Sequence, residues 1–485
     1  MKKLRLLFYL VILSPLFLAG QDIHHIIIPF DSLIDQIEKQ SGDSRILTML
    51  LLSEAYQTVS LEKSIETGEA ALLEASQRDK PELSAKIYRS LANSARLSGD
   101  FQLSNEFYSK ANEIYHQLGN ELQQAYISNN MAYNLLEQAE SEVAESEFLA
   151  ALQIAEKHQD DTLVMLISLN LGKTYYQRGA FSEAYDWLYR ALLIADQQHN
   201  DFYWATAQQS IAMIHWQWDE NDKALTMLFE VAKVFENHNN NEHLSKVYNN
   251  IGLVYLYDKN QPDSALIYFN QALQIRYNNG WYQAAADVMI NIAIAQTDQG
   301  NYADALNLLI QSQQIFEQAQ AIEAMIRILH QQGKIYHLTK EYPTSNELLH
   351  NSLRMAQDAA LDHYIPIITE LMLKNYELMN DFTGFLSIYK LYTAHYDSIY
   401  SQLIAMHSSE TDWKSENQTL MRHLEAQKNQ TILLEKKIQS LRYYLGAIAA
   451  FVVVFMLSWW IYKISYNTSS SDKGYIRRLL VNLKK

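Results

Sequence analysis

The chain has 485 residues, a formal net charge of −16 and no cysteine. The negative charge argues against a general nucleic-acid-binding role, and the absence of cysteine excludes disulfides, thiol catalysis and thiolate zinc sites. Only six prolines and 14 glycines interrupt the sequence, which leaves little room for a loop-rich fold.

The first 20 residues have the features of a secretory signal peptide. An apolar run ends at Leu18-Ala19-Gly20, which offers a cleavage site before Gln21. The run is preceded by the basic residues Lys2, Lys3 and Arg5. An uncleaved anchor helix is the alternative interpretation. Both interpretations place the following residues on the far side of the membrane, beginning with a leader over 21–44.

Inside residues 85–402 a small residue returns every 40 residues, with one step of 41. The series is Ala92, Ala132, Gly172, Ala212, Gly252, Ala293 and Gly333. Two further small-residue series keep step with it, from Ser104 and from Ala111, and large apolar residues stand between them, from Tyr108. A fixed period on a helical background predicts an all-α solenoid of stacked helix pairs.

Each unit of this solenoid is expected to contain two amphipathic helices, A and B. The small residues let the paired backbones approach closely, and the large residue fills the seam against the next unit. Loop-forming residues mark the turn between the helices, as in Gly99-Asp100 and Gly179-Ala180. The extra residue of the 41-residue step falls in such a turn, at Asn260-Gln261-Pro262, and therefore leaves both helices in phase.

The segment LGKTYYQRGAFSEAYDWLYRAL resembles the tetratricopeptide (TPR) repeat, because it places in order Gly172, Tyr175, Gly179, Phe181, Ala184, Leu188 and Ala191. The usual family period is about 34 residues, so this sequence resembles a long-helix variant. The resemblance covers 45–402, with about nine helix pairs, seven of them clear. The first and last repeats are degenerate, as capping repeats often are. In the last repeat, Leu373 and Phe385 stand where small residues are expected.

Three segments follow the repeats. Residues 403–443 are polar and lack proline and glycine, and a 3.5-residue frame from Asn417 to Leu445 predicts a coiled-coil stalk and a homodimer. A single stalk helix packed on the last repeat is the alternative. Residues 444–462 carry no charge and have aromatic residues at both ends, which predicts one transmembrane helix. Given the signal segment, we expect the repeats in the periplasm and residues 463–485 as a short basic cytoplasmic tail at the inner membrane.

The resemblance implies that helix A of each repeat lines the concave face of a superhelix. One position on that face is mostly amide, with four asparagines and one glutamine in eight: Ser90, Asn130, Asn170, Ser210, Asn250, Asn291, Gln331 and Leu371. Asparagine is a poor helix former, and one amide offers both a hydrogen-bond donor and an acceptor. Long-repeat, peptide-binding TPR proteins use asparagine in this way to hold a peptide backbone. The alternative is that asparagine is simply tolerated on a solvated face.

The same face is basic on an acidic protein. Its eight basic residues are Lys86, Arg89, Arg96, Lys173, Lys246, Arg327, Lys334 and Lys374, against five acidic ones. Tyrosines lie among them. A basic, amide-lined face suits a peptide or protein segment that carries carboxylates. The predicted peptide-binding residues are Arg89, Asn130, Tyr133, Asn170, Lys173, Tyr176, Asn250, Asn291 and Lys334.

The sequence contains no recognisable catalytic, cofactor-binding or metal-binding motif. The sequence has no Gly-rich phosphate loop and no HExxH, so no enzymatic activity, cofactor or metal is expected. His215 takes a repeat position that is otherwise held by tyrosine, and packing explains it better than catalysis.

The layout resembles bacterial membrane-anchored TPR regulators, which carry a histidine kinase or a helix-turn-helix after the membrane helix. Residues 463–485 are too short for either domain, so they dock on a separate cytoplasmic signalling partner or on anionic lipid, or are the remnant of a truncated gene. We therefore expect a non-enzymatic receptor or adaptor. A static scaffold for an envelope protein complex is the alternative.

Overall fold

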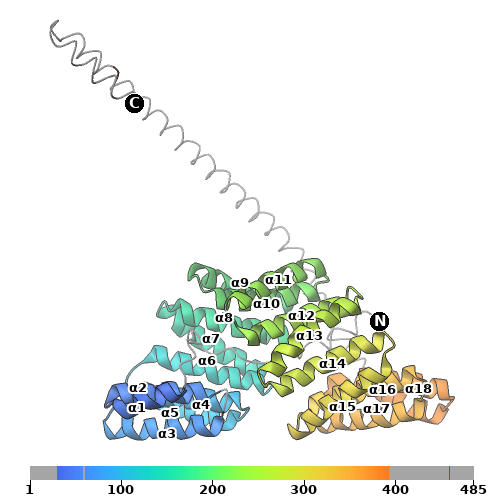
Figure 1. The fold of residues 1–485 in the computed structure, drawn as a ribbon, viewed down its shortest axis with the longest axis horizontal. Helices are drawn as coiled ribbons and strands as arrows, with labels where there is room; N and C mark the ends of the chain where they lie inside the picture. The colour runs from blue at the N-terminus through green and yellow to red at the C-terminus, as the bar shows by residue number, and fades with distance from the viewer. Residues whose placement is uncertain (1–29, 58–59, 393–457, 459–485) are drawn as a thin grey trace. The chain divides into compact units, whose positions relative to one another are not determined.

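The computed structural model describes residues 30–57, 60–392 and Ser458, and Figure 1 shows their course. The described helices belong to the first of two compact units, Met1–Glu410 and Thr411–Lys485. The expected signal peptide (1–20), stalk (403–443), transmembrane helix (444–462, apart from Ser458) and tail (463–485) lie outside the described residues. Among the helices that are described, none combines the length and the apolar character needed to cross a bilayer.

The described helices follow one another along the sequence, joined by short turns. They are α1 (Phe30–Lys39), α2 (Asp43–Tyr56), α3 (Leu61–Gln77), α4 (Pro81–Leu97), α5 (Phe101–Gln117), α6 (Glu121–Glu137), α7 (Ser141–Lys157), α8 (Asp161–Gln177), α9 (Phe181–Gln197), α10 (Asp201–Gln217), α11 (Asn221–Asn237), α12 (Asn241–Tyr257), α13 (Pro262–Asn278), α14 (Tyr282–Asp298), α15 (Tyr302–Gln318), α16 (Ile322–Leu338), α17 (Tyr342–Asp358), the 3₁₀ turn η2 (Asp362–Tyr364) and α18 (Ile365–Met379). Residues 382–392 are also helical.

The helices pair as the period predicts. The even-numbered helices from α2 to α18 are the A helices, and the odd-numbered helices from α3 to α17 are the B helices. Each helix packs against the next in sequence, and A helices also contact the A helices of adjacent repeats. The all-α solenoid of stacked helix pairs is therefore confirmed. The segment expected as a leader contains α1, which packs against α2, and the Phe30 ring stacks on Tyr56 with centroids 4.8 Å apart.

One turn geometry recurs between consecutive helices. After α4, the backbone N–H of Gly99 donates to the carbonyl of Arg96 (3.0 Å), and that of Asp100 donates to the carbonyl of Ala95 (2.9 Å). This pattern satisfies helix-terminal carbonyls and needs one residue with positive φ, here Gly99 at 82°. The 41-residue step is taken up at residues 258–261, a turn one residue longer than its neighbours, where Gln261 N–H donates to Tyr255 (2.9 Å). The predicted site of the insertion is thus correct.

The small-residue series has a direct steric cause. A Cβ added at Gly172 would lie 2.5 Å from Leu188 Cγ, and one added at Gly252 would lie 2.5 Å from Phe269 Cδ1. The large residue of helix B thus packs on the small residue of its own helix A, whereas we expected its main contact to be with the next repeat. This close packing fixes the spacing of the two helices within a repeat.

The last repeat packs differently. Leu373 and Phe385 occupy its small-residue positions, and Leu373 is buried. Close approach moves instead to Gly384, where an added Cβ would collide with the Tyr376 ring. The terminal repeat therefore keeps the helix pair but changes the residue at which the backbones meet.

Candidate functional site

The predicted peptide-binding residues all lie on A helices, of which α8 is the most buried. Of the 17 residues of α8, 13 are buried, against six of the 17 in α9, its B partner. A helix that is buried all round packs against neighbours on both faces, here the B helices and the adjacent A helices. On α8 the predicted concave face is therefore largely covered by the protein's own side chains.

The amide position is buried as well, because Asn130, Asn170, Asn250 and Asn291 all have little exposure. Two of these side chains make the same inter-repeat contact. Asn170 Nδ2 donates to Asn129 Oδ1 (2.9 Å), and Asn291 Nδ2 donates to Asn249 Oδ1 (2.8 Å). Buried, paired amides do not fit the alternative of asparagines on a solvated face. They join neighbouring A helices, which the sequence-based prediction did not include.

Three A helices meet at the ring of Tyr133, and we call Arg96, Tyr133, Glu137 and Lys173 the Tyr133 cluster. From α8, Lys173 Nζ lies 4.6 Å from the ring centroid and donates to Tyr133 Oη (2.9 Å) and to Glu137 Oε1 (2.5 Å). From α4, Arg96 Cζ lies 5.3 Å from the same centroid. Two cations thus converge on one aromatic ring, an arrangement that stabilises both through the negative face of the ring.

The electrostatics of the Tyr133 cluster follow from its burial. Burial lowers the pKa of Lys173, and the Glu137 carboxylate opposes that shift. Burial also raises the pKa of Tyr133 well above its ordinary value, with Glu137 adding to the rise. Lys173 and Glu137 neutralise each other. Arg96 has no carboxylate within ion-pair distance among the described residues, although only 7 % of it is exposed.

The other predicted residues are distributed along the A helices. Arg89 Nη1 donates to Gln123 Oε1 (3.0 Å), and Tyr176 Oη accepts from Gln217 Nε2 (3.3 Å). Lys334 lies 3.4 Å from Asp298 on the preceding A helix. The structure therefore brings Tyr133 and Lys173 together. Asn250, Asn291 and Lys334 belong to later repeats, on α12, α14 and α16.

Several partners of the predicted residues escaped the sequence analysis, including Asn129, Gln217 and Asn249, and Glu137 was counted among the five acidic residues of this face but not assigned to the site. One signal was available for Glu137. It precedes Lys173 by 36 residues, and Asp298 precedes Lys334 by the same interval. A charge pair that recurs at equivalent positions of two repeats indicates a contact between adjacent A helices. Arg96 was counted among the basic residues but not assigned to the site.

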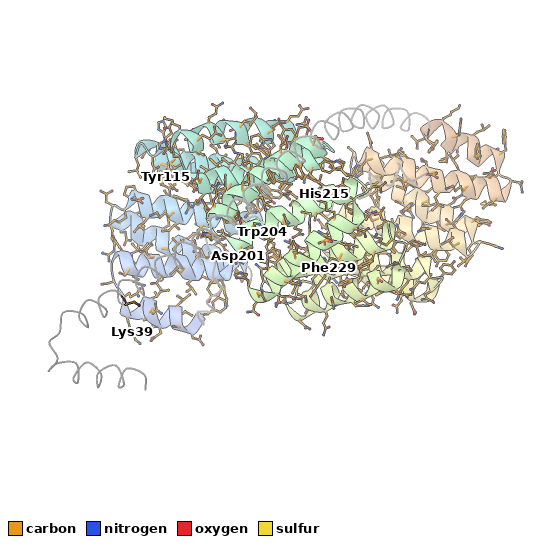
Figure 2. The ribbon with its side chains drawn as sticks, turned by 90° about the horizontal axis from the view of Figure 1, so that it is seen from above. Lys39, Tyr115, Asp201, Trp204, His215 and Phe229 are labelled. Atoms are coloured by element: carbon orange, nitrogen blue, oxygen red, sulfur yellow. The ribbon has the colours of Figure 1, made fainter. Side chains whose placement is uncertain are left out.

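His215 is a packing residue, as predicted. Its Nδ1 lies 2.8 Å from Glu220 Oε2, and its ring meets those of Tyr185 and Trp218 edge-on. Figure 2 labels it on α10, together with Trp204 of the same helix and Phe229 of α11. Its surroundings are aromatic and nearly closed to solvent.

Comparison with known proteins agrees with the helical-repeat fold. The family profile "Soluble NSF attachment protein, SNAP" matches residues 212–365. Among solved structures, a Rap protein complexed with competence and sporulation factor is 13 % identical, with a TM-score of 0.51, over 77 % of this chain and 100 % of that one. The chain is a TPR-like helical-repeat protein. No curated protein sequence matches it.

Two further TPR-like structures are similar to this protein. A signal-transduction ATPase with a tetratricopeptide repeat sensor, from Pyrococcus horikoshii, is 12 % identical with a TM-score of 0.51, over 84 % of this chain and 64 % of that one. The apo quorum sensor NprR from B. thuringiensis is 13 % identical with a TM-score of 0.50, over 73 % and 99 %. At these identities the likeness shows the fold alone.

Proposed function

We propose that this TPR-like protein is a non-enzymatic receptor or adaptor in signalling, which holds a peptide or protein segment along its A helices. One observation carries the proposal. At the amide position, the Oδ1 of Asn170 and the Oε1 of Gln331 are buried and accept no hydrogen bond from the residues that the structure describes. Buried polar atoms are almost always paired, and the backbone N–H groups of an extended peptide would supply the missing donors.

Access to these oxygens requires the A helices to separate slightly. Each repeat of a solenoid depends mainly on its neighbours, and the described A helices follow this rule. A small rotation between two repeats therefore opens the amide position without unfolding either repeat. The cost of this opening reduces the affinity for the ligand, as in other complexes that need a conformational change.

The similar structures support a sensing role. One is a Rap protein in complex with competence and sporulation factor, another is described as a quorum sensor, and the third carries a repeat sensor. The apolar signal at 1–20 and the uncharged run at 444–462 further support anchorage in the inner membrane. In this proposal the repeats face the periplasm, and residues 463–485 engage a separate cytoplasmic partner.

The test compares Asn170→Ala with Asn129→Ala in the full-length protein. Both variants break the hydrogen bond between these two side chains, but only Asn170→Ala removes the unpaired oxygen. The probe is a decapeptide selected from a randomised pool by binding to the unmodified protein. We expect similar melting temperatures for the two variants and an affinity about fivefold weaker for Asn170→Ala alone, since one hydrogen bond contributes about 1 kcal/mol.

Two results would contradict the proposal. Equal affinities of the two variants would exclude Asn170 as a ligand contact. Failure to select any peptide, together with stable capture of a whole envelope complex, would favour the static scaffold.

A further inference from the structure

The last described helix, residues 382–392, exposes large apolar side chains on one face. Phe382 is 72 % exposed, more than any other large apolar residue that the structure describes, and Leu386 and Tyr389 are 44 % and 47 % exposed. Because they follow one another by four and then three positions, the three residues lie on the same face of the helix. Exposed apolar residues that gather in one stripe indicate an interaction surface.

The corresponding face of the preceding B helix, α17, carries no such stripe. The buried Ile388 corresponds to the buried Leu349 of α17, since each follows the small residue of its helix by four positions. In this alignment the exposed positions of α17 are held by Pro343, Glu347 and His350. The apolar exposed face is thus a feature of the last helix and not a general feature of the repeat.

The last helix is also apolar on an adjoining face, which packs on its own repeat. Ile388 is buried there, and Phe385, Leu391 and Tyr392 pack against the same hydrophobic cluster. Phe385 connects the two faces, because its ring stacks on that of Tyr389 with centroids 5.9 Å apart. A helix that packs on one neighbour needs only one apolar stripe. Two adjoining stripes therefore indicate a helix with two neighbours, of which the repeat is one.

The spacing of the apolar residues indicates the second neighbour. Four of them recur at alternating steps of three and four, which is the spacing of a coiled-coil seam. They are Phe382, Phe385, Tyr389 and Tyr392. In the sequence the same spacing continues without a break to Asn417, where the frame predicted for the stalk begins. The intervening positions are Tyr396, Ile399, Leu403, Met406, Glu410 and Trp413, and only one of these is charged.

We propose that residues 382–392 pack against the same helix of a second, parallel copy of this chain, so that the homodimer seam begins on the repeats themselves. About three turns of helix are too short for a stable dimer, since a standard interface covers about 800 Å² of each partner. The unbroken frame supplies the remaining length. An identical helix offers the same spacing, and a parallel pair places like positions opposite each other. This inference does not depend on peptide binding by the A helices.

The proposed contact also accounts for the atypical residue of the last repeat. Phe385 stands where the repeat pattern has a small residue, and the close approach to the A helix is made by Gly384 instead. That change leaves Phe385 at a seam position, in contact with both its own repeat and Tyr389. The last helix therefore belongs both to the solenoid and to the dimer contact.

The test is disulfide cross-linking of the full-length protein in native membranes, since the chain has no cysteine of its own. Phe382→Cys and Tyr389→Cys, made separately, should each form a disulfide-linked dimer on oxidation, because the seam positions of parallel copies face each other. Thr383→Cys and Lys390→Cys are the matched controls, one residue further along the same helix at exposed positions beside the seam. They should form little dimer.

A second comparison asks whether the dimer depends on this apolar face. Tyr389→Glu, combined with Phe382→Cys, places two carboxylates opposite each other and should cause loss of the cross-linked dimer. Ile310→Glu, combined with Phe382→Cys, charges a residue of α15 with a similar exposure, 49 % against 47 %, and should keep it. Circular-dichroism melting establishes that the repeats of both variants remain folded.

Three results would overturn the inference. The first is equal cross-linking at the seam and control positions of the helix. The second is a dimer that forms through Leu424→Cys in the stalk but not through Phe382→Cys or Tyr389→Cys, since the seam would then begin beyond this helix. The third is a Phe382→Cys dimer that persists in the Tyr389→Glu variant. Absence of a dimer at every position would likewise exclude a second copy, and would leave the face to another part of the chain or to a different protein.

Discussion

Two equivalent ion pairs, four repeats apart, lie in different surroundings. Lys173–Glu137 and Lys334–Asp298 each join adjacent A helices and have the same 36-residue separation. The side chains of the first pair are 4 % and 14 % exposed, and those of the second are 35 % and 41 % exposed. At Lys173 the preceding repeat presents Tyr133, and at Lys334 it presents Ile294 at the equivalent position. The buried pair thus has an aromatic neighbour and the exposed pair an aliphatic one, and a buried pair is far more sensitive to loss of one partner.

The largest effect is expected from Glu137→Gln, which leaves Lys173 buried without a counterion. We expect a loss of about 3 kcal/mol in stability, because an unpaired buried charge is strongly unfavourable. Asp298→Asn is the matched control and should cost less than about 1 kcal/mol, since its pair is solvent-screened. Hydrogen exchange of the α6, α8, α14 and α16 amides would measure both losses locally. Equal losses would show that the burial difference has no energetic consequence.

A smaller effect is expected from the two glycines in the same repeats. Gly172→Ala places a Cβ 2.5 Å from Leu188 Cγ, whereas Gly333→Ala places one 2.9 Å from Leu349. Overpacking costs about 1–3 kcal/mol, and alanine in a helix interior returns up to about 1 kcal/mol. We therefore expect Gly172→Ala to lower the melting temperature and Gly333→Ala to leave it nearly unchanged. The opposite order would mean that Leu188 repacks more easily than Leu349.

Acid should weaken the α16 repeat through His330. Burial lowers its pKa to about 3, against 6.5 ordinarily. The unfolded state takes up this proton below pH 6.5 and the folded state does not, so stability present at neutral pH is lost as the pH falls toward 3. At pH 5 the loss is at most about 2 kcal/mol. This loss is measured by the melting temperatures of the unmodified protein and of His330→Gln at pH 7.5 and pH 5.0. If the variant keeps the same pH dependence, the loss belongs to other titratable groups.

The smallest effect is expected where both regions use the same polar contact. Asn134 Nδ2 donates to Ser104 Oγ (2.9 Å), and Asn375 Nδ2 donates to Ser345 Oγ (2.8 Å). Each asparagine keeps a second acceptor, Asn105 or Asn346, when its serine is lost. Ser104→Ala should therefore cost about 0.5–1.5 kcal/mol, and Ser345→Ala should cost more, because Ser345 Oγ also donates to the carbonyl of Gly333 (2.7 Å). Equal falls in the two melting temperatures would show that this additional hydrogen bond contributes nothing to stability.

The repeat architecture was predictable because its cause is local and recurs. The small residue at Gly172 and the large residue at Leu188 appear in the sequence at a fixed interval, and so does the extra residue before Pro262. The 30-residue interval of the polar pairs could also have been recognised. Where the B-helix series has Ser64, Ser104 or Ser345 in place of alanine, the residue 30 positions later is polar, and the two side chains are in contact.

The hydrogen-bond partners and the burial of the predicted site residues were less predictable. The pairing of Asn170 with Asn129 depends on the rotation between adjacent repeats, which no interval in the sequence reveals. The burial of Arg96 depends likewise on how Tyr133 of the next repeat covers it. The sequence therefore identified the helices and the polar positions, but the choice between internal pairing and ligand contact needed the packing of three A helices.

The shared turn has a consequence for how the number of repeats changes in evolution. The backbone reverses direction in the same way after A and B helices, and Asn200 and Asn240 each cap the next helix by accepting its backbone N–H from Tyr203 and His243. Loss of residues 200–239 would join His199 to Asn240. An asparagine would then still follow His199 and would still cap the next helix. Duplication of residues 200–239 would likewise preserve the turn and the helix cap at its junctions. The number of units, and with it the length of any bound partner, is therefore free to vary by gene rearrangement in steps of 40 residues.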